Sequence, residues 1–419
     1  MEKASLKPGA EKVLVALSGG SSSRAMLQLL YEYNREEPHK KSKKQVFKSV
    51  EVCFIDESTI VGGEKDTVEN VLQMAQKLNY NIMRIPLEDI FSPDYTTSGI
   101  YDNVIKISTD GVHRKPSQEL FHSIQQQSEN TSNRDKLKAL LDGASKTTVK
   151  EDFYCFLKLS LLLQYAQRKD CTRLFLGDSS TRLAIKTISL TSKGRGFSLP
   201  LEIAGETQWF GDTKIMRPMK DMLSKEIGLY NQFLHLDSVF IPSLTTMLPP
   251  KASIERLTED FIVGLERDYP STVSTVARTA AKLKPSELMQ DEKCIICLMP
   301  RQPNTKSWQD RFTVANTNSA AYTSMPTCSS SFSDGCCNVT SSECSKPVKR
   351  ANTDISDLLC YGCRVNMRDV GDVTFPPYVA EKVNEQRQEE LRRQIEVFLL
   401  SDDEEEQGEI GKEVHIQKR

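Results

Sequence analysis

The sequence predicts an α/β protein with a doubly wound parallel sheet, followed by a helical region and a small cysteine-based module. Short apolar strand patterns alternate with amphipathic helices over the first 90 residues, which is typical of βαβ crossovers in a parallel sheet. Helical patterns dominate after residue 218. Two CxxC pairs, Cys294/Cys297 and Cys360/Cys363, follow them and indicate a compact metal-binding or redox element.

The predicted strands are short apolar runs that end at glycine, proline or charged residues. They are residues 12–18, 47–55, 81–86, 173–176 and 214–218. Helices are expected where apolar residues recur at helical spacing. These are residues 23–33, 64–78 and 153–167, a helix from about residue 180, and residues 225–234, 252–266, 271–283 and 379–400.

Composition divides the chain into six parts. A polar stretch offers little to bury and is interpreted as an insertion, and a Ser/Thr-rich spacer separates the two CxxC pairs. The predicted boundaries are 1–90 for the first part of a nucleotide-binding-like α/β domain, 91–150 for the insertion, 151–235 for the rest of that domain, 236–290 for the helical region, 291–370 for the CxxC module and 371–419 for a charged helix and acidic tail.

Charge and hydropathy exclude some classes of protein. The 55 Lys and Arg residues nearly balance 57 Asp and Glu residues, so whole-chain charge gives no argument for nucleic-acid binding. No run approaches the ~18 apolar residues of a transmembrane helix, and the polar N-terminus lacks the apolar stretch of a secretory signal. We expect a cytoplasmic protein without membrane contact, in which the eleven cysteines are thiols or metal ligands.

The loop after the first predicted strand has the composition of an anion-binding site. It comprises Ser18, Gly19, Gly20, Ser21, Ser22 and Ser23. Glycines let the backbone turn sharply, and hydroxyls, backbone N–H groups and a helix N-terminus can together hold a phosphate. The spacing fits neither G-x-G-x-x-G nor the Walker pattern, which disfavours a dinucleotide fold or a P-loop nucleotidase. Alternatively, the serines only cap the following helix.

The run VLVALSGG, followed by a helix, resembles the phosphate loop of the N-type ATP pyrophosphatases, or adenine-nucleotide α-hydrolases, which is SGGxDS. The resemblance implies a sheet of the ATP pyrophosphatase type. In that family the aspartate helps to arrange ATP and magnesium, whereas this chain has Ser22 at its position. A hydroxyl is a poorer magnesium ligand than a carboxylate, so we expect weak ATP/Mg²⁺ binding at most and no catalysis by this loop alone.

Five further segments resemble the cytoplasmic tRNA 2-thiolation protein 2 family. They are residues 177–202, 214–231, 269–283, 294–300 and 358–369. The resemblance implies a subunit of the complex that thiolates the wobble uridine, U34, of tRNA. Family members usually begin with a cysteine-rich segment upstream of the first strand, and this chain starts just before that strand, so we expect a shortened form.

The same resemblance implies three partners. They are the catalytic homologue, cytoplasmic tRNA 2-thiolation protein 1, in a heterodimer; tRNA for Lys, Glu and Gln carrying an mcm5U-type uridine; and a thiocarboxylated ubiquitin-related modifier as sulfur donor. The implied chemistry is adenylation of the uridine C2 oxygen by ATP, after which sulfur attacks and AMP leaves. Because the homologue has an intact loop, we assign the chemistry to it, and tRNA holding and complex assembly to this chain.

Two other functions stay open on the sequence alone. In one, this chain itself binds ATP and activates the uridine, with Asp178 and Asp56 replacing the missing carboxylate. Asp178 follows the fourth predicted strand, where ligands bind in open α/β sheets, although it could also cap the next helix. In the other, the chain is a purely structural partner that touches neither ATP nor RNA.

A basic stripe follows the same turn. Arg182, Lys186 and Lys193 have a spacing that favours one helix face, and Arg195 lies between two glycines. Such a stripe could hold tRNA phosphates without reading sequence. The alternative is a solvated charged surface.

The two CxxC pairs have the spacing that places thiolates on one tetrahedral metal, and zinc is the preferred interpretation. Their separation of 62 residues exceeds that of ordinary zinc ribbons, although loop-closure cost grows only slowly with length. The alternatives are a redox-active or persulfide-carrying CxxC and unpaired thiols.

Overall fold

The computed structural model describes residues 11–34, 47–62, 65–92, 131–286, 292–304, 358–371 and 373–396. Most of the predicted insertion, the Ser/Thr-rich spacer, the acidic tail and the N-terminal segment fall outside these residues. Among the described helices, none is long and apolar enough to cross a membrane.

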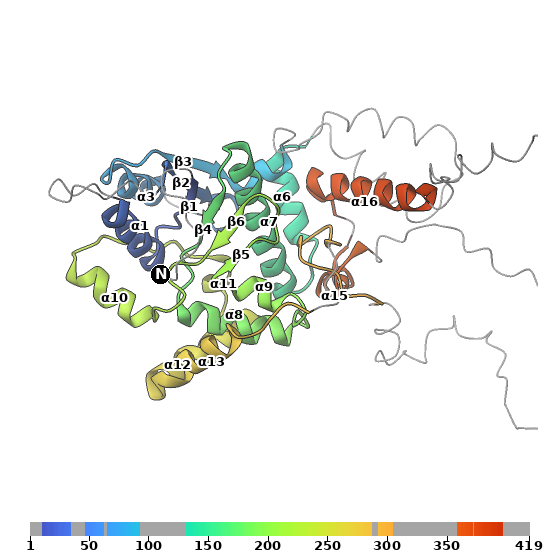
Figure 1. Ribbon diagram of the computed structural model, residues 1–419. Helices are drawn as coiled ribbons and strands as arrows, with labels where there is room; N and C mark the ends of the chain where they lie inside the picture. The colour runs from blue at the N-terminus through green and yellow to red at the C-terminus, as the bar shows by residue number, and fades with distance from the viewer. Residues whose placement is uncertain are drawn as a thin grey trace, which may run out of the picture.

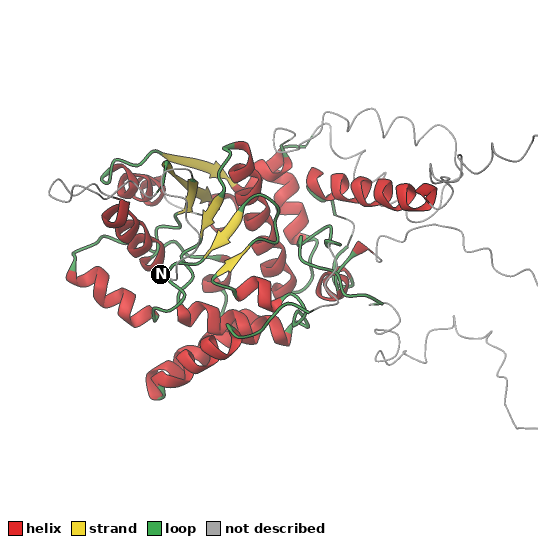
Figure 2. Cartoon of the chain, in the orientation of Figure 1, coloured by secondary structure: helices red, strands yellow, loops and turns green. Residues whose placement is uncertain are grey.

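A six-stranded sheet forms the centre of the fold (Figures 1 and 2). Its strands are β1 (Lys12–Ala16), β2 (Ser49–Asp56), β3 (Ile82–Pro86), β4 (Arg173–Phe175), β5 (Glu206–Thr207) and β6 (Lys214–Met216), in the order β3-β2-β1-β4-β6-β5. The five predicted strands all form and pair in parallel. The two-residue β5, too short to give a period-2 signal, pairs antiparallel to β6 at the edge. The predicted doubly wound α/β class is confirmed.

Helices cover both faces of this sheet (Figure 2). The described helices are α1 (Ser21–Asn34), α2 (Ser58–Val61), α3 (Lys65–Gln76), the 3₁₀ helix η1 (Leu87–Phe91), α6 (Asn133–Asp142), α7 (Thr147–Arg168), α8 (Ser180–Ser192), α9 (Leu199–Ile203), α10 (Ser224–Phe233), α11 (Leu244–Met247), α12 (Ile254–Asp268), α13 (Pro270–Ala280), α15 (Tyr361–Met367) and α16 (Pro377–Glu396). Successive side chains of β1 point to opposite faces. Val13 therefore shares a core cluster with Leu27 of α1, whereas Leu14 shares one with Leu161 of α7.

Helix α6 lies inside the stretch predicted as a polar insertion, yet it contributes to the core. Ser132 caps its N-terminus by accepting a hydrogen bond from the Asp135 backbone N–H. Leu137, Leu140 and Leu141, at helical spacing, are all buried. The described end of this stretch is thus an integral part of the α/β core.

The cysteine-bearing segments pack on the same core. Cys294 and Cys363 belong to the hydrophobic cluster that contains Leu161 of α7. Phe375, just before α16, meets Phe153 of α7 edge to face, with ring centroids 6.0 Å apart. The cysteine-based module therefore packs directly against helix α7.

Candidate phosphate loop and four-cysteine metal centre

The Gly-Ser loop lies where the sequence predicts it, between β1 and α1 at the point where the strand order reverses. Gly19 has a positive φ of 80°, and a Cβ there would lie 2.6 Å from Val71 Cγ2, so this position requires glycine. Ser23 is buried and closes the loop, because its Oγ donates to the Gly20 carbonyl oxygen (3.0 Å) and accepts from the Ser18 N–H (3.3 Å).

Three serines leave the loop able to meet an anion. Ser18 and Ser21 are exposed and Ser22 is half-buried, all at the carboxyl end of β1 and the N-terminus of α1. Such N-terminal N–H groups attract anions. One side of the loop is covered, since the Val239 N–H donates to the Gly19 carbonyl oxygen at 2.9 Å.

The carboxylates at this edge are already paired with cations. Asp178 Oδ2 accepts from Lys186 Nζ (2.9 Å) and Arg217 Nε (3.1 Å). Burial acts to raise the pKa of Asp178, but the charges of Lys186 and Arg217 outweigh it and hold that pKa below its usual value. Asp56 likewise accepts from Arg84 Nε at 2.8 Å and from the Ser58 N–H at 3.0 Å. Asp178 and Asp56 are therefore both neutralised by cations of the chain itself.

The predicted basic stripe is not a common exposed face. The side chains of Lys193 and Arg195 are buried, and both donate to the Asp152 carboxylate, at 2.9 and 3.3 Å. Lys186 is engaged with Asp178. Arg182 alone of the four predicted residues has a side chain more than a third exposed, at 41%. Lys193 and Arg195 are therefore not available to a phosphate at the surface, because both side chains are buried against Asp152.

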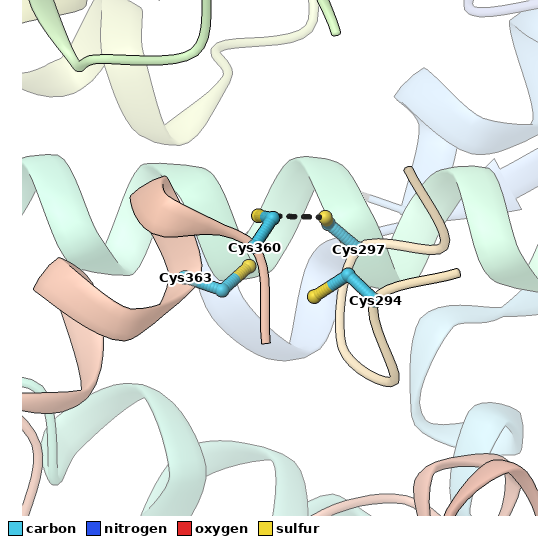
Figure 3. A group of neighbouring side chains, drawn as sticks. All are labelled: Cys294, Cys297, Cys360 and Cys363. Carbon is cyan, nitrogen blue, oxygen red and sulfur yellow. Dashed lines mark hydrogen bonds between the residues drawn. The ribbon is translucent and has the colours of Figure 1, made fainter. Parts of the chain in front are cut away.

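The four predicted metal-ligating cysteines converge. The Sγ atoms of Cys294, Cys297, Cys360 and Cys363 all lie within 4.8 Å of one another, and all four residues are buried. Figure 3 shows two of them on the loop before residue 300 and two at the start of α15, with their sulfurs facing one another. Cys297 Sγ and Cys360 Sγ are 3.6 Å apart. This cluster could hold one metal ion.

Two long side chains fix the first cysteine loop. Trp209 Nε1 donates to the Leu298 carbonyl oxygen at 2.8 Å, and Tyr378 Oη donates to the Ile296 carbonyl oxygen at 2.9 Å. Cys294 closes a tight turn, because its N–H donates to the Met299 carbonyl oxygen at 2.8 Å. Trp209 and Tyr378 come from distant parts of the chain, so no local motif could reveal them.

Sequence reasoning also missed the residues that neutralise the predicted ones. Arg217, Arg84 and Asp152 are far in sequence from the groups they pair with. The available signal was a charged residue directly after or within an apolar run, as at Arg84 and Arg217. Arg217 is buried and must therefore be paired, whereas the Arg84 side chain is about half exposed. In neither case can the partner be read from spacing.

The parallel sheet with a Gly-Ser loop at its switch point, joined to a buried four-thiol cluster, defines a doubly wound α/β protein with a candidate metal site. A family model described as cytoplasmic tRNA 2-thiolation protein 2 matches residues 253–365. The chain is 31% identical to that protein of Xenopus tropicalis, over 95% of this chain and 86% of the relative. It is 30% identical to that of Bos taurus, over 96% and 85%. The chain belongs to the cytoplasmic tRNA 2-thiolation protein 2 family.

A comparison of structures gives a weaker likeness. The U34-tRNA thiolase of Methanococcus maripaludis with its [4Fe-4S] cluster is 16% identical, with a TM-score of 0.42, over 66% of this chain and 72% of that one. The fold assignment therefore rests on the strand order and register of this chain itself.

Proposed function

We propose that this chain is the non-catalytic subunit of the cytoplasmic complex that 2-thiolates the wobble uridine of tRNA. Membership of the cytoplasmic tRNA 2-thiolation protein 2 family over 95% of the chain is the observation that carries this proposal. The subunit holds tRNA and pairs with its catalytic homologue, cytoplasmic tRNA 2-thiolation protein 1. The sulfur comes from a thiocarboxylated ubiquitin-related modifier.

The charge arrangement at the loop supports a non-catalytic role. Magnesium favours carboxylate oxygens, and the loop offers the hydroxyl of Ser22 where the ATP pyrophosphatase pattern has aspartate. Asp56 and Asp178 are held by arginine or lysine. Any nucleotide at Ser18 and Ser21 would thus lack a metal ligand from this edge.

We also propose zinc for the four-cysteine cluster. A tetrahedron with Zn–S bonds of about 2.3 Å has sulfur atoms about 3.8 Å apart, which a cluster with separations up to 4.8 Å approaches. The zinc would hold the loop at Cys294 and Cys297 to α15 and supply folding free energy. Burial of every thiol disfavours a persulfide carrier, since sulfur exchange needs access to a partner.

The loop and Arg182 are the proposed contacts for tRNA phosphates. Arg182→Glu should weaken tRNA binding and reduce the slope of log K against log salt by about one. Arg267→Glu, on an exposed residue at the end of α12, is the matched charge control. Equal affinity and slope for the Arg182 variant and the wild type would remove this residue from the interface.

Release of AMP that depends on tRNA tests the division of labour. This chain, the presumed catalytic homologue and the two together would each receive ATP, tRNA and the sulfur donor. We expect no AMP from this chain alone, and more from the pair than from the homologue alone. AMP from this chain alone would establish the alternative in which it is itself the adenylating enzyme. No gain from the pair would contradict the supporting role.

A further inference from the structure

A buried guanidinium lies against the four-cysteine cluster. The Arg195 side chain is only 1% exposed, and its Nη1 and Nη2 lie 3.9 Å from Cys360 Sγ and 3.7 Å from Cys363 Sγ. Its other contacts are the Asp152 carboxylate, at 3.3 Å, and the face of the Phe156 ring, 4.6 Å from the centroid. Both N–H···S contacts thus involve the second CxxC pair, Cys360 at the N-cap of α15 and Cys363 in its first turn.

The charge at this point explains why an arginine is tolerated in the interior. A buried cation is costly unless it is paired and hydrogen-bonded. Asp152 is shared, because it also accepts from Lys193 Nζ (2.9 Å) and Asn366 Nδ2 (2.8 Å). Four thiolates around a divalent ion leave a net charge of −2, which a neighbouring guanidinium partly neutralises. Its planar fork of donors can reach two sulfurs and a carboxylate together.

Two glycines make room for this contact. A Cβ on Gly362, between the two cysteines of α15, would lie 2.8 Å from Arg195 Cζ. A Cβ on Gly194, which has a φ of 72°, would lie 2.5 Å from Tyr361 Cε1. The Gly194–Arg195 turn and the second CxxC pair can therefore pack closely because each contributes a glycine at the contact. The predicted basic residue and the predicted metal ligands belong to one centre.

We propose that Arg195 is a positioning residue of the metal centre, which donates N–H···S hydrogen bonds to Cys360 and Cys363 and links them through Asp152 to α7. This inference rests on the proposed metal site. The hydrogen bonds hold the two sulfurs toward the ion and withdraw electron density from them. Partners of this kind in the outer shell of metal sites typically change metal affinity by about 10–100-fold.

Metal affinity of the full chain tests this role. The chain is prepared with Zn²⁺ and titrated with a chromophoric chelator, and a Co²⁺-loaded sample gives the sulfur-to-cobalt charge-transfer bands. Arg195→Gln should bind Zn²⁺ about 10–100-fold more weakly and shift those bands. Arg195→Lys keeps the charge but loses the planar set of guanidinium donors, so its Zn²⁺ affinity should lie between those of the wild type and Arg195→Gln. Arg267→Gln, which removes an exposed arginine at the end of α12, should match the wild type.

A second variant guards against a loss of folding in Arg195→Gln. Gly362→Ala leaves every charge in place but adds a Cβ where the guanidinium lies, so it should also shift the cobalt bands. Wild-type affinity and bands in both Arg195→Gln and Gly362→Ala would overturn the proposal and leave the metal centre intact. A wild-type chain that binds neither ion would overturn the metal centre and this inference together, without touching the proposed role in tRNA thiolation.

Discussion

The carboxyl edge of the sheet and the four-cysteine centre contain buried charge in opposite ways. At the edge, Asp178 is paired with Arg217 and Lys186, and Asp56 with Arg84. At the centre, four buried thiol groups converge, and Arg195 is the cation seen in contact with their sulfurs among the described residues. The first arrangement is complete without a ligand, whereas the second calls for a metal ion.

This difference shows which residue types in this chain are satisfied by internal partners and which call for a ligand. A carboxylate that a neighbouring cation satisfies contributes to stability and no longer needs magnesium. Four converging thiols are not satisfied by one another in this way, because sulfur forms only weak hydrogen bonds. The edge is therefore expected to respond to mutation and pH as a packed structure, and the centre as a ligand site.

The largest expected effect follows from removal of one thiol. Cys360→Ser replaces a soft ligand by a hydroxyl, so bound zinc should fall from about one per chain to well below one, and the first thermal transition should drop by roughly 10 °C. Elemental analysis and calorimetry measure the two. Cys155→Ser, at an exposed cysteine, is the control and should retain the metal. A Cys360→Ser chain that still binds about one zinc ion would contradict the view that the four-cysteine centre, unlike the sheet edge, is a ligand site.

The ion pairs of the edge should give the next effect, with a defined pH dependence. Asp178→Asn leaves Arg217 buried without its partner and should lower the free energy of unfolding by about 3 kcal/mol at pH 7. The folded-state pKa of Asp178 is depressed by Lys186 and Arg217, against the opposing effect of burial. Its contribution is therefore full above the ordinary aspartate pKa of about 3.9 and declines as the pH falls below it.

Urea unfolding of both proteins at pH 7, 5 and 3 measures this gap. The difference between wild type and Asp178→Asn should be constant between pH 7 and 5 and smaller at pH 3. Asp237→Asn, at an exposed residue that pairs with Lys77, should cost less than about 1 kcal/mol throughout. A gap that widens toward low pH would show that Asp178 is not stabilised as a carboxylate.

The fold could be predicted because its signals are local. After a basic first residue, the strands at 12–16 and 173–175 consist only of apolar residues (VLVA and LF), as expected for parallel strands buried on both faces. The order of the chain then requires crossovers of one hand. The strand β5 could not be predicted, because two residues are too few to show an alternating pattern. The core role of α6 could not be predicted either, because its buried residues Leu137 and Leu140 lie in a stretch that is polar on the whole.

The site was predictable in its cysteines and loop but not in its charges. CxxC spacing and a Gly-Ser turn after a strand are local, and the structure brings each set together. Whether Arg195 faces solvent or sulfur depends on Asp152, 43 residues away, and on Cys363, 168 residues away. The local sequence pattern therefore indicated a basic stripe at the surface, whereas tertiary packing buries the Arg195 side chain.

The smallest expected effect concerns the backbone of the loop. Gly19→Ala places a Cβ 2.6 Å from Val71 Cγ2 at a φ of 80°, and should lower the free energy of unfolding by about 1–3 kcal/mol. Gly20→Ala is the matched control, because the nearest atom to its Cβ, Ser18 Oγ, is 3.7 Å away and its φ is not positive. Its cost should stay within about 1 kcal/mol.

Urea midpoints of the two alanine variants compare them directly. A larger loss of stability for Gly19→Ala than for Gly20→Ala means that the turn requires the constrained backbone that a phosphate loop would need. Equal costs would mean that the turn relaxes freely, and the loop would then be an ordinary helix cap. These variants thus test the backbone of the loop without changing any side chain that could bind a ligand. At the four-cysteine centre no such test is possible, because the side chains that could bind a metal also hold the backbone in place.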